Sequence, residues 1–93
     1  MKDYTILVNI SMDLDYNPLY KIRAIIEETK GEHLYDAVYP EQSTGRYKVY
    51  TITYKTASRP DALNIATKIA QLHGVEFRAI KEAYGKYRKL SSK

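Results

Sequence analysis

The chain of 93 residues contains no cysteine, no tryptophan and a single phenylalanine. Without cysteine there is no disulfide framework, no thiolate nucleophile and no cysteine-ligated zinc site. Long apolar runs are also missing, because Asn9 interrupts the one near the N-terminus and acidic residues follow it closely. So short and polar a run is neither a secretory signal nor a membrane span. These absences predict a cytoplasmic protein that does not associate with membranes.

Residues typical of catalytic and metal sites are scarce as well. The two histidines, His33 and His73, fall at the ends of a predicted strand and a predicted helix, where a surface role is more common than metal binding. The motif D-x-D-x-N at residues 13–17 opens like an EF-hand calcium loop, but Pro18 stands where that loop needs glycine. The glycines are isolated and form no phosphate-cradling loop. We therefore expect no enzyme, no catalytic residue, no metal and no cofactor.

The spacing of apolar residues predicts four strands and two helices in the order β-α-β-β-α-β. Alternating or β-branched stretches mark the strands, at residues 4–12, 33–40, 46–56 and 75–80. The helices begin at the capping residues Asn17 and Ser58, and Gly31 and Gly74 end them. This order is that of the ferredoxin-like plait, an α+β fold with a four-stranded antiparallel sheet, strand order 4-1-3-2, and both helices on one face. An alternative keeps these elements but lengthens the fourth strand or replaces its end with a third helix.

Alternation also assigns residues to the core or to the outer face of the sheet. The expected core is formed by Ile6, Val8, Ile10, Ile22, Ile26, Ile52, Leu63, Ala66, Ile69 and Phe77. The third strand is predicted to turn Tyr50, Ile52 and Tyr54 inward and Tyr47, Val49 and Thr51 outward. The fourth is predicted to turn Val75, Phe77 and Ala79 inward and Glu76, Arg78 and Ile80 outward. Because two helices cover only one side of the sheet, the outer face is free for water or a partner.

The positive charge of the chain is concentrated at its C-terminus. Residues 81–93 contain five basic residues and one acidic residue, a net +4 that equals the net charge of the whole chain. Residues 1–80 are therefore neutral. Apolar alternation fades beyond Ile80, and Gly85 interrupts any helix that follows. We expect one domain over residues 1–84 and a flexible basic tail over residues 85–93.

The sequence favours a nucleic-acid-binding module, for either RNA or DNA. Tyrosines on an open sheet face can stack on bases, and a basic tail can follow a phosphate backbone. The candidate nucleic-acid-binding residues are Lys86, Tyr87, Arg88 and Lys89 in the tail and Arg46, Tyr47 and Arg78 on the sheet. The stretch VYPEQSTGRYKVY also resembles a hairpin of small ribosomal-subunit proteins with the plait fold, in which Tyr-Pro precedes the turn and aromatic residues follow it. This resemblance implies nucleic-acid binding too.

A protein-interaction module is the alternative, because nucleic-acid binders usually carry a basic face on the folded domain as well. In that case the chain is a homodimer through the open sheet face, or a small inhibitor or adaptor, such as a phage or mobile-element protein, that docks on a larger protein. A third hypothesis, small-molecule sensing, would use the loops at residues 13–17 and 56–60, where the sequence shows no ligand chemistry.

Overall fold

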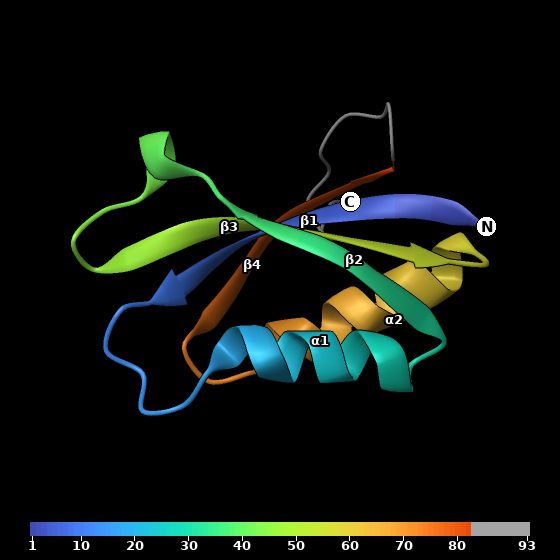
Figure 1. The fold of residues 1–93 in the computed structure, drawn as a ribbon, viewed down its shortest axis with the longest axis horizontal. Helices are drawn as coiled ribbons and strands as arrows, with labels where there is room; N and C mark the ends of the chain where they lie inside the picture. Colours follow the sequence, from blue (N-terminus) through green and yellow to red (C-terminus); the bar gives the residue numbers. More distant parts are fainter. Residues whose placement is uncertain (83–93) are drawn as a thin grey trace.

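The computed structural model describes residues 1–82. Along the chain it contains β1 (Lys2–Ser11), α1 (Pro18–Glu28), β2 (Gly31–Val38), the short 3-10 helix η1 (Pro40–Gln42), β3 (Tyr47–Thr56), α2 (Arg59–Ala70) and β4 (Val75–Glu82). The strands form one antiparallel sheet in the order β2-β3-β1-β4, the predicted order read from the other edge. Both helices lie on one side of this sheet, and η1 rises on the other side (Figure 1). The predicted α+β plait is confirmed, whereas the predicted boundary at residue 84 and the tail 85–93 lie outside the described residues.

Both helices begin at the capping residues that the sequence predicts. In α1, the Asn17 side-chain oxygen accepts hydrogen bonds from the backbone N–H groups of Leu19 and Tyr20, at 3.1 and 3.4 Å. In α2, the Ser58 hydroxyl accepts from the N–H of Asp61 at 3.3 Å. These bonds satisfy N–H groups that have no partner within the first turn of a helix, and each such cap stabilises a protein by about 1 kcal/mol.

The two glycines predicted to end the helices have different roles. After α1 it is Lys30, with φ of 60°, that takes the left-handed conformation, and Gly31 is already the first residue of β2. Gly31 is required by close packing instead, because a Cβ there would lie 2.9 Å from Cδ1 of Ile65 in α2. Gly74 does not end α2 either, because the helix ends at Ala70 and Gln71 is its C-cap; with φ of 80°, Gly74 instead lies against the Leu14 side chain just before β4.

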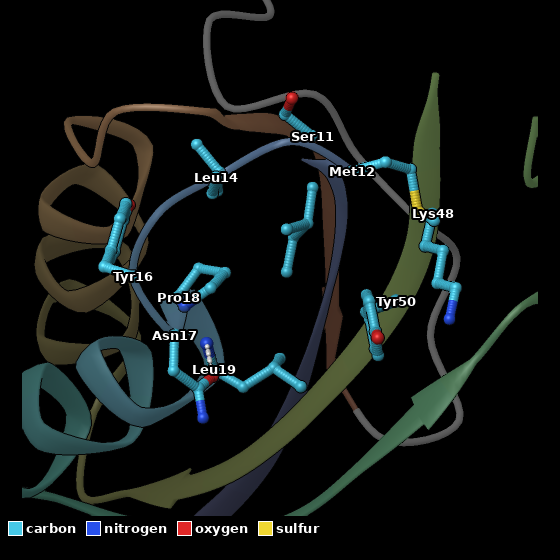
Figure 2. Close-up of a pocket in the computed structure, with 10 residues that line it drawn as sticks. Ser11, Met12, Leu14, Tyr16, Asn17, Pro18, Leu19, Lys48 and Tyr50 are labelled. Carbon is cyan, nitrogen blue, oxygen red and sulfur yellow. Dashed lines mark hydrogen bonds between the residues drawn. The ribbon is translucent and has the colours of Figure 1, made fainter. Parts of the chain in front are cut away.

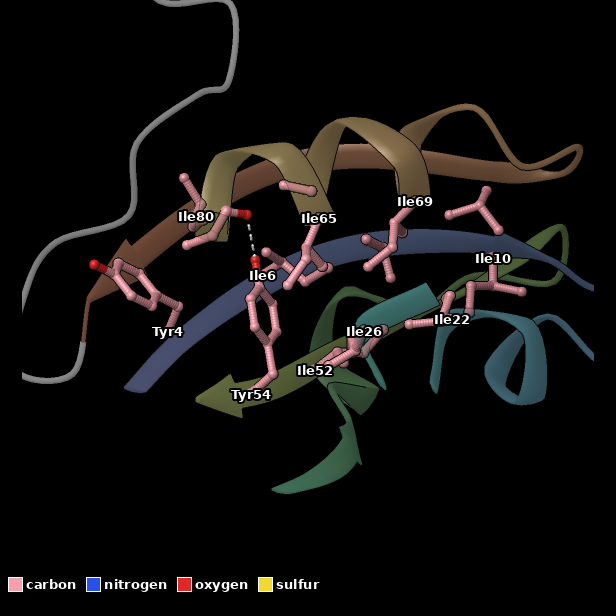
Figure 3. Packing of buried hydrophobic residues seen from close by; sticks show 14 residues of the cluster. Tyr4, Ile6, Ile10, Ile22, Ile26, Ile52, Tyr54, Ile65, Ile69 and Ile80 are labelled. Atoms are coloured by element: carbon pink, nitrogen blue, oxygen red, sulfur yellow. Dashed lines mark hydrogen bonds between the residues drawn. The ribbon is translucent and has the colours of Figure 1, made fainter. Parts of the chain in front are cut away.

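The core lies between the sheet and the two helices (Figure 3). Its buried residues are Tyr4, Ile6, Val8, Ile10, Ile22, Ile26, Ile52, Tyr54, Ala62, Ile65, Ala66, Ile69, Val75 and Ile80. Of the predicted core residues, Leu63 and Phe77 only pack against this cluster partly buried, and the others belong to it. Ile65 is fully buried and was not predicted, although it completes the i, i+3, i+4, i+7 stripe of α2 that begins at Ala62.

A pair of tyrosines closes one end of the core. Tyr4 and Tyr54 are directly opposite on β1 and β3, and their ring centroids are 6.4 Å apart. The Tyr54 hydroxyl points toward α2 and donates to the carbonyl of Ala62 at 2.8 Å (Figure 3). The buried Tyr4 hydroxyl has no hydrogen-bond partner among residues 1–82. Burial raises the pKa of both hydroxyls above the ordinary tyrosine value, and the Glu82 carboxylate adds to the increase at Tyr4.

The faces of β4 differ from those that strict alternation predicts. Phe77 and Ala79 pair with consecutive residues of β1, so Arg78 between them has no residue opposite and forms a β-bulge. Beyond the bulge the inward and outward positions are exchanged. Ile80 therefore lies in the core at 6% exposure and Ala79 faces outward, and the prediction was wrong for both.

Candidate nucleic-acid interface

The side of the sheet opposite the helices is called here the open face. Its side chains, assigned from the strand register, are those of Thr5, Leu7, Asn9 and Ser11 on β1, Tyr47, Val49, Thr51 and Thr53 on β3, Tyr35 and Ala37 on β2, and Glu76, Arg78, Ala79 and Lys81 on β4. Hydroxyl groups occupy its middle, where the Thr5 and Thr53 hydroxyl oxygens are 3.0 Å apart and hydrogen-bonded. The open face thus combines threonines in the centre with arginines and an aromatic ring toward one end.

That end is partly covered by the connection between β2 and β3, residues 39–46, which includes η1. The N–H of Tyr39 donates to the carbonyl of Val49 at 2.7 Å, and the N–H of Val49 donates to the Ser43 hydroxyl at 3.0 Å. Val49 turns outward as predicted, but its side chain is 0% exposed. It therefore contributes to packing under the connection and offers no surface to a ligand.

A chain of polar contacts runs from β4 to η1 at the same end. The amide nitrogen of Asn9 donates to Oε1 of Glu76 at 2.9 Å. Nη1 of Arg78 donates to Oε1 of Gln42 at 2.7 Å and, at a longer 3.5 Å, to Oδ1 of Asn9. Asn9 is only 9% exposed, so it is a fixed part of the sheet surface. The partners of the Arg78 guanidinium are therefore neutral amide oxygens.

Arg46 and Tyr47 lie beside this chain of contacts. They line a shallow cavity of about 310 Å³ whose other walls are Asn9, Ser11, Gly74, Val75 and Glu76. Arg46 is exposed and its carbonyl accepts from the N–H of Met12 at 3.0 Å, while Tyr47 is half-buried. The sequence-predicted residues on the sheet thus meet at one end of the open face: Arg46 and Tyr47 share a cavity with Asn9, and Asn9 contacts Arg78.

Residues 1–82 have no net charge, so the positive charges of Arg46 and Arg78 at this end are balanced by acidic residues elsewhere in this part of the chain. The whole chain has 15 basic and 11 acidic residues, and residues 83–93 contain four basic residues and no acidic one, which leaves 11 of each in residues 1–82. Within residues 1–82, neither Arg46 nor Arg78 forms an ion pair. Lys86, Tyr87, Arg88 and Lys89, the other predicted binding residues, lie outside the described residues.

The other residues considered from the sequence have structural partners. His33 Nε2 lies 2.7 Å from a carboxylate oxygen of Asp36 on β2, and the side chains of both are largely buried. In the motif at residues 13–17, Asp13 accepts a hydrogen bond from the Ser11 hydroxyl, which lowers the pKa of its carboxyl, and Asn17 caps α1. Over residues 1–82, no three His, Asp or Glu side chains come together as a metal site.

A second cavity of about 310 Å³ lies on the helix side of the sheet and was not predicted. Pro18 and Leu19 at the start of α1 face Tyr50 of β3 across it, and Lys48 lies at its rim (Figure 2). The loop at residues 13–17, which the sensing hypothesis singled out, forms part of its wall. Residue pattern pointed to this loop but not to Lys48 and Tyr50, because a strand far along the chain supplies the opposite wall.

No protein-family model matches the chain, and no curated protein matches its sequence. The class of protein is therefore defined by the fold: a small α+β plait whose second sheet face is left open by α1 and α2 and is covered at one end by the connection that contains η1. No helix in that part of the chain is both long and apolar enough to cross a membrane.

Proposed function

We propose that the protein is a small, non-enzymatic, cytoplasmic module that binds nucleic acid through the open face and the basic C-terminal residues. The observation that carries this proposal is the grouping of Arg46, Tyr47 and Arg78 at one end of the open face. An aromatic ring grouped with two guanidinium groups suits a nucleic-acid strand, because the ring can stack on a base while the arginines bind phosphates. Neither arginine is ion-paired within residues 1–82, so no carboxylate of that part of the chain competes with a phosphate for it.

The tail supplies the rest of the positive charge in this proposal. Lys86, Arg88 and Lys89 bind phosphates, and Tyr87 stacks on a base. Each neutralised phosphate contributes roughly −0.9 to the slope of log affinity against log salt on duplex DNA, and roughly −0.7 on a single strand. The three tail charges together with Arg46 and Arg78 should therefore give a slope of about −4 to −5 on a duplex. Removing residues 85–93 should reduce its magnitude by about 2 to 3.

The test is a fluorescence anisotropy titration of labelled single-stranded RNA, single-stranded DNA and duplex DNA at several salt concentrations. Arg46→Gln should reduce the magnitude of the salt slope by about 0.7 to 0.9. The matched control is Arg23→Gln on α1, which removes the same charge and breaks only an exposed pair with Glu27. Equal slopes for both variants would count against the open face as the binding surface.

A second pair of variants, one test and one control, examines the proposed stacking of Tyr47 on a base. Tyr47→Ala should weaken single-strand binding by about 1–3 kcal/mol, the usual contribution of one stacked base. Tyr20→Ala makes the same change on α1, where Tyr20 is 72% exposed and on the opposite side of the sheet from the open face. Binding that both variants leave unchanged would show that Tyr47 does not stack on a base.

Protein interaction is the second candidate, and the charge balance of residues 1–82 favours it. In this case a second copy or a larger protein covers the open face, and Tyr47→Glu should prevent the association without unfolding the domain. Sedimentation velocity of the full chain and of this variant decides the matter. A dimer that becomes a monomer in the variant, together with no salt-dependent binding of any oligonucleotide, would favour this second function over the first.

A further inference from the structure

We propose that Gln42 and Asn9 are positioning residues, which hold Arg78 so that one edge of its guanidinium stays open to a phosphodiester oxyanion. This inference rests on the proposed function and names the chemistry of one contact within it. Nη1 of Arg78 is occupied by its 2.7 Å bond to Gln42 and its longer contact with Asn9. Nε and Nη2 have no hydrogen-bond partner within residues 1–82. These two nitrogens form the fork that binds two oxygens of a phosphate side by side.

The partners of Arg78 are unusual because a carboxylate is available nearby. Glu76 lies two residues earlier on β4, yet the two side chains form no ion pair. The Asn9 amide lies between them, since its nitrogen takes the Glu76 oxygen and its own oxygen faces Arg78. Within residues 1–82 the guanidinium is thus held by neutral amides, and no carboxylate offsets its positive charge at this point. The hydrogen bonds that it donates to a phosphate are charge-assisted, which makes them about twice as strong as hydrogen bonds between neutral groups.

The contact between Gln42 and Arg78 also links the two edges of the sheet. Gln42 belongs to η1, in the connection that follows the edge strand β2, and Arg78 lies on β4, the other edge. The bulge leaves Arg78 without a residue opposite it on β1, and its side chain extends over the open face toward η1. The same contact also fastens η1 to the sheet. Gln42 could serve only to hold η1 on the sheet, or it could also hold the Arg78 side chain in place for a phosphate. One substitution distinguishes these two roles.

That substitution is Gln42→Glu, which retains the shape of the side chain and gives Arg78 a carboxylate partner. If the contact only fastens η1, the new ion pair strengthens it and leaves nucleic-acid binding as it was. If Gln42 positions a free charge, the carboxylate neutralises Arg78, and affinity for duplex DNA falls about tenfold. The salt slope should lose about 0.9 of its magnitude, as it should in Arg78→Gln. Thermal unfolding should show that Gln42→Glu is folded and no less stable than the natural chain.

Gln71→Glu is the matched control, because it makes the same change at the C-terminus of α2, away from the open face. It should retain the affinity of the natural chain within about twofold, since a distant exposed charge is screened by salt. If Gln42→Glu binds as tightly as Gln71→Glu while Arg78→Gln loses affinity, the positioning role is overturned and the proposed function stands. If the natural chain shows no salt-dependent binding, the proposed function itself fails and this inference fails with it.

Discussion

The tyrosine pair at the end of the core provides the sharpest test of the packing, because the same substitution should have opposite effects at its two members. Tyr54→Phe removes a buried hydroxyl that donates to the Ala62 carbonyl at 2.8 Å. A typical intramolecular hydrogen bond contributes about 0.5–1.5 kcal/mol net, so this variant should lose about 1 kcal/mol of unfolding free energy. Tyr4→Phe removes a buried hydroxyl that has no hydrogen-bond partner within the described part of the chain. Since leaving a buried polar group unsatisfied costs about 1–3 kcal/mol, its removal should stabilise the protein by about 1 kcal/mol.

The two variants should therefore differ by about 2 kcal/mol, which corresponds to a gap of about 10 °C in Tm for a domain of this size. Circular dichroism melts at neutral pH measure the gap directly, and urea titrations give the free energies. Both rings remain in place in both variants, so loss of core packing does not confuse the comparison. If Tyr4→Phe destabilises the protein as much as Tyr54→Phe does, the Tyr4 hydroxyl has a partner and this account of the core end is wrong.

Two further predictions concern pH and the glycines. Because burial raises the pKa of Tyr54, the unfolded chain loses this proton first, and stability should fall above about pH 10 by roughly 1.4 kcal/mol per pH unit; the raised pKa of Tyr4 acts in the same direction. Urea titrations across this range should show a shallower fall for Tyr54→Phe, and an unchanged slope would contradict the assignment. Gly31→Ala should destabilise by about 1–3 kcal/mol through overpacking, and Gly74→Ala by about 1–2 kcal/mol through its positive φ. Gly45→Ala, where an added Cβ meets nothing within 4 Å, should change unfolding free energy by less than about 0.5 kcal/mol.

Much of this fold could be predicted from local patterns. Alternation in β1 and β3 and the spacing in α1 place the right side chains in the core, because in regular elements side-chain direction follows directly from position. The caps at Asn17 and Ser58 were predictable for the same reason, since each acts on N–H groups within three residues of itself. The strand order then follows from the known handedness of crossovers.

The errors occur where a local pattern is broken by a non-local feature. The bulge at Arg78 exchanges the faces of Ala79 and Ile80. No residue of β4 marks the position of this bulge in the sequence. Val49 is buried because the β2–β3 connection returns over the sheet, and alternation reports the side on which a residue lies but not what covers it. Ile65 was missed although its spacing fits the helix stripe.

The candidate site shows the same division. Arg46, Tyr47 and Arg78 could be proposed from residue type and strand face, and the structure groups them at one end of the open face. Asn9 and Gln42 could not be proposed. They are uncharged and belong to no motif, and their contacts with Arg78 link residues 69 and 36 positions apart in sequence. Such contacts exist only in the folded chain.

The central claim is that nucleic acid binds on the open face, and an NMR titration of the isotope-labelled full chain tests it most directly. Backbone amide shifts would be followed while an unlabelled oligonucleotide is added. Binding on the open face predicts that the largest shifts arise at Asn9, Tyr47 and Arg78 and that the amides in α1 and α2 change least. Shifts that are largest in the two helices, or no shifts at low salt for RNA and DNA alike, would contradict the claim.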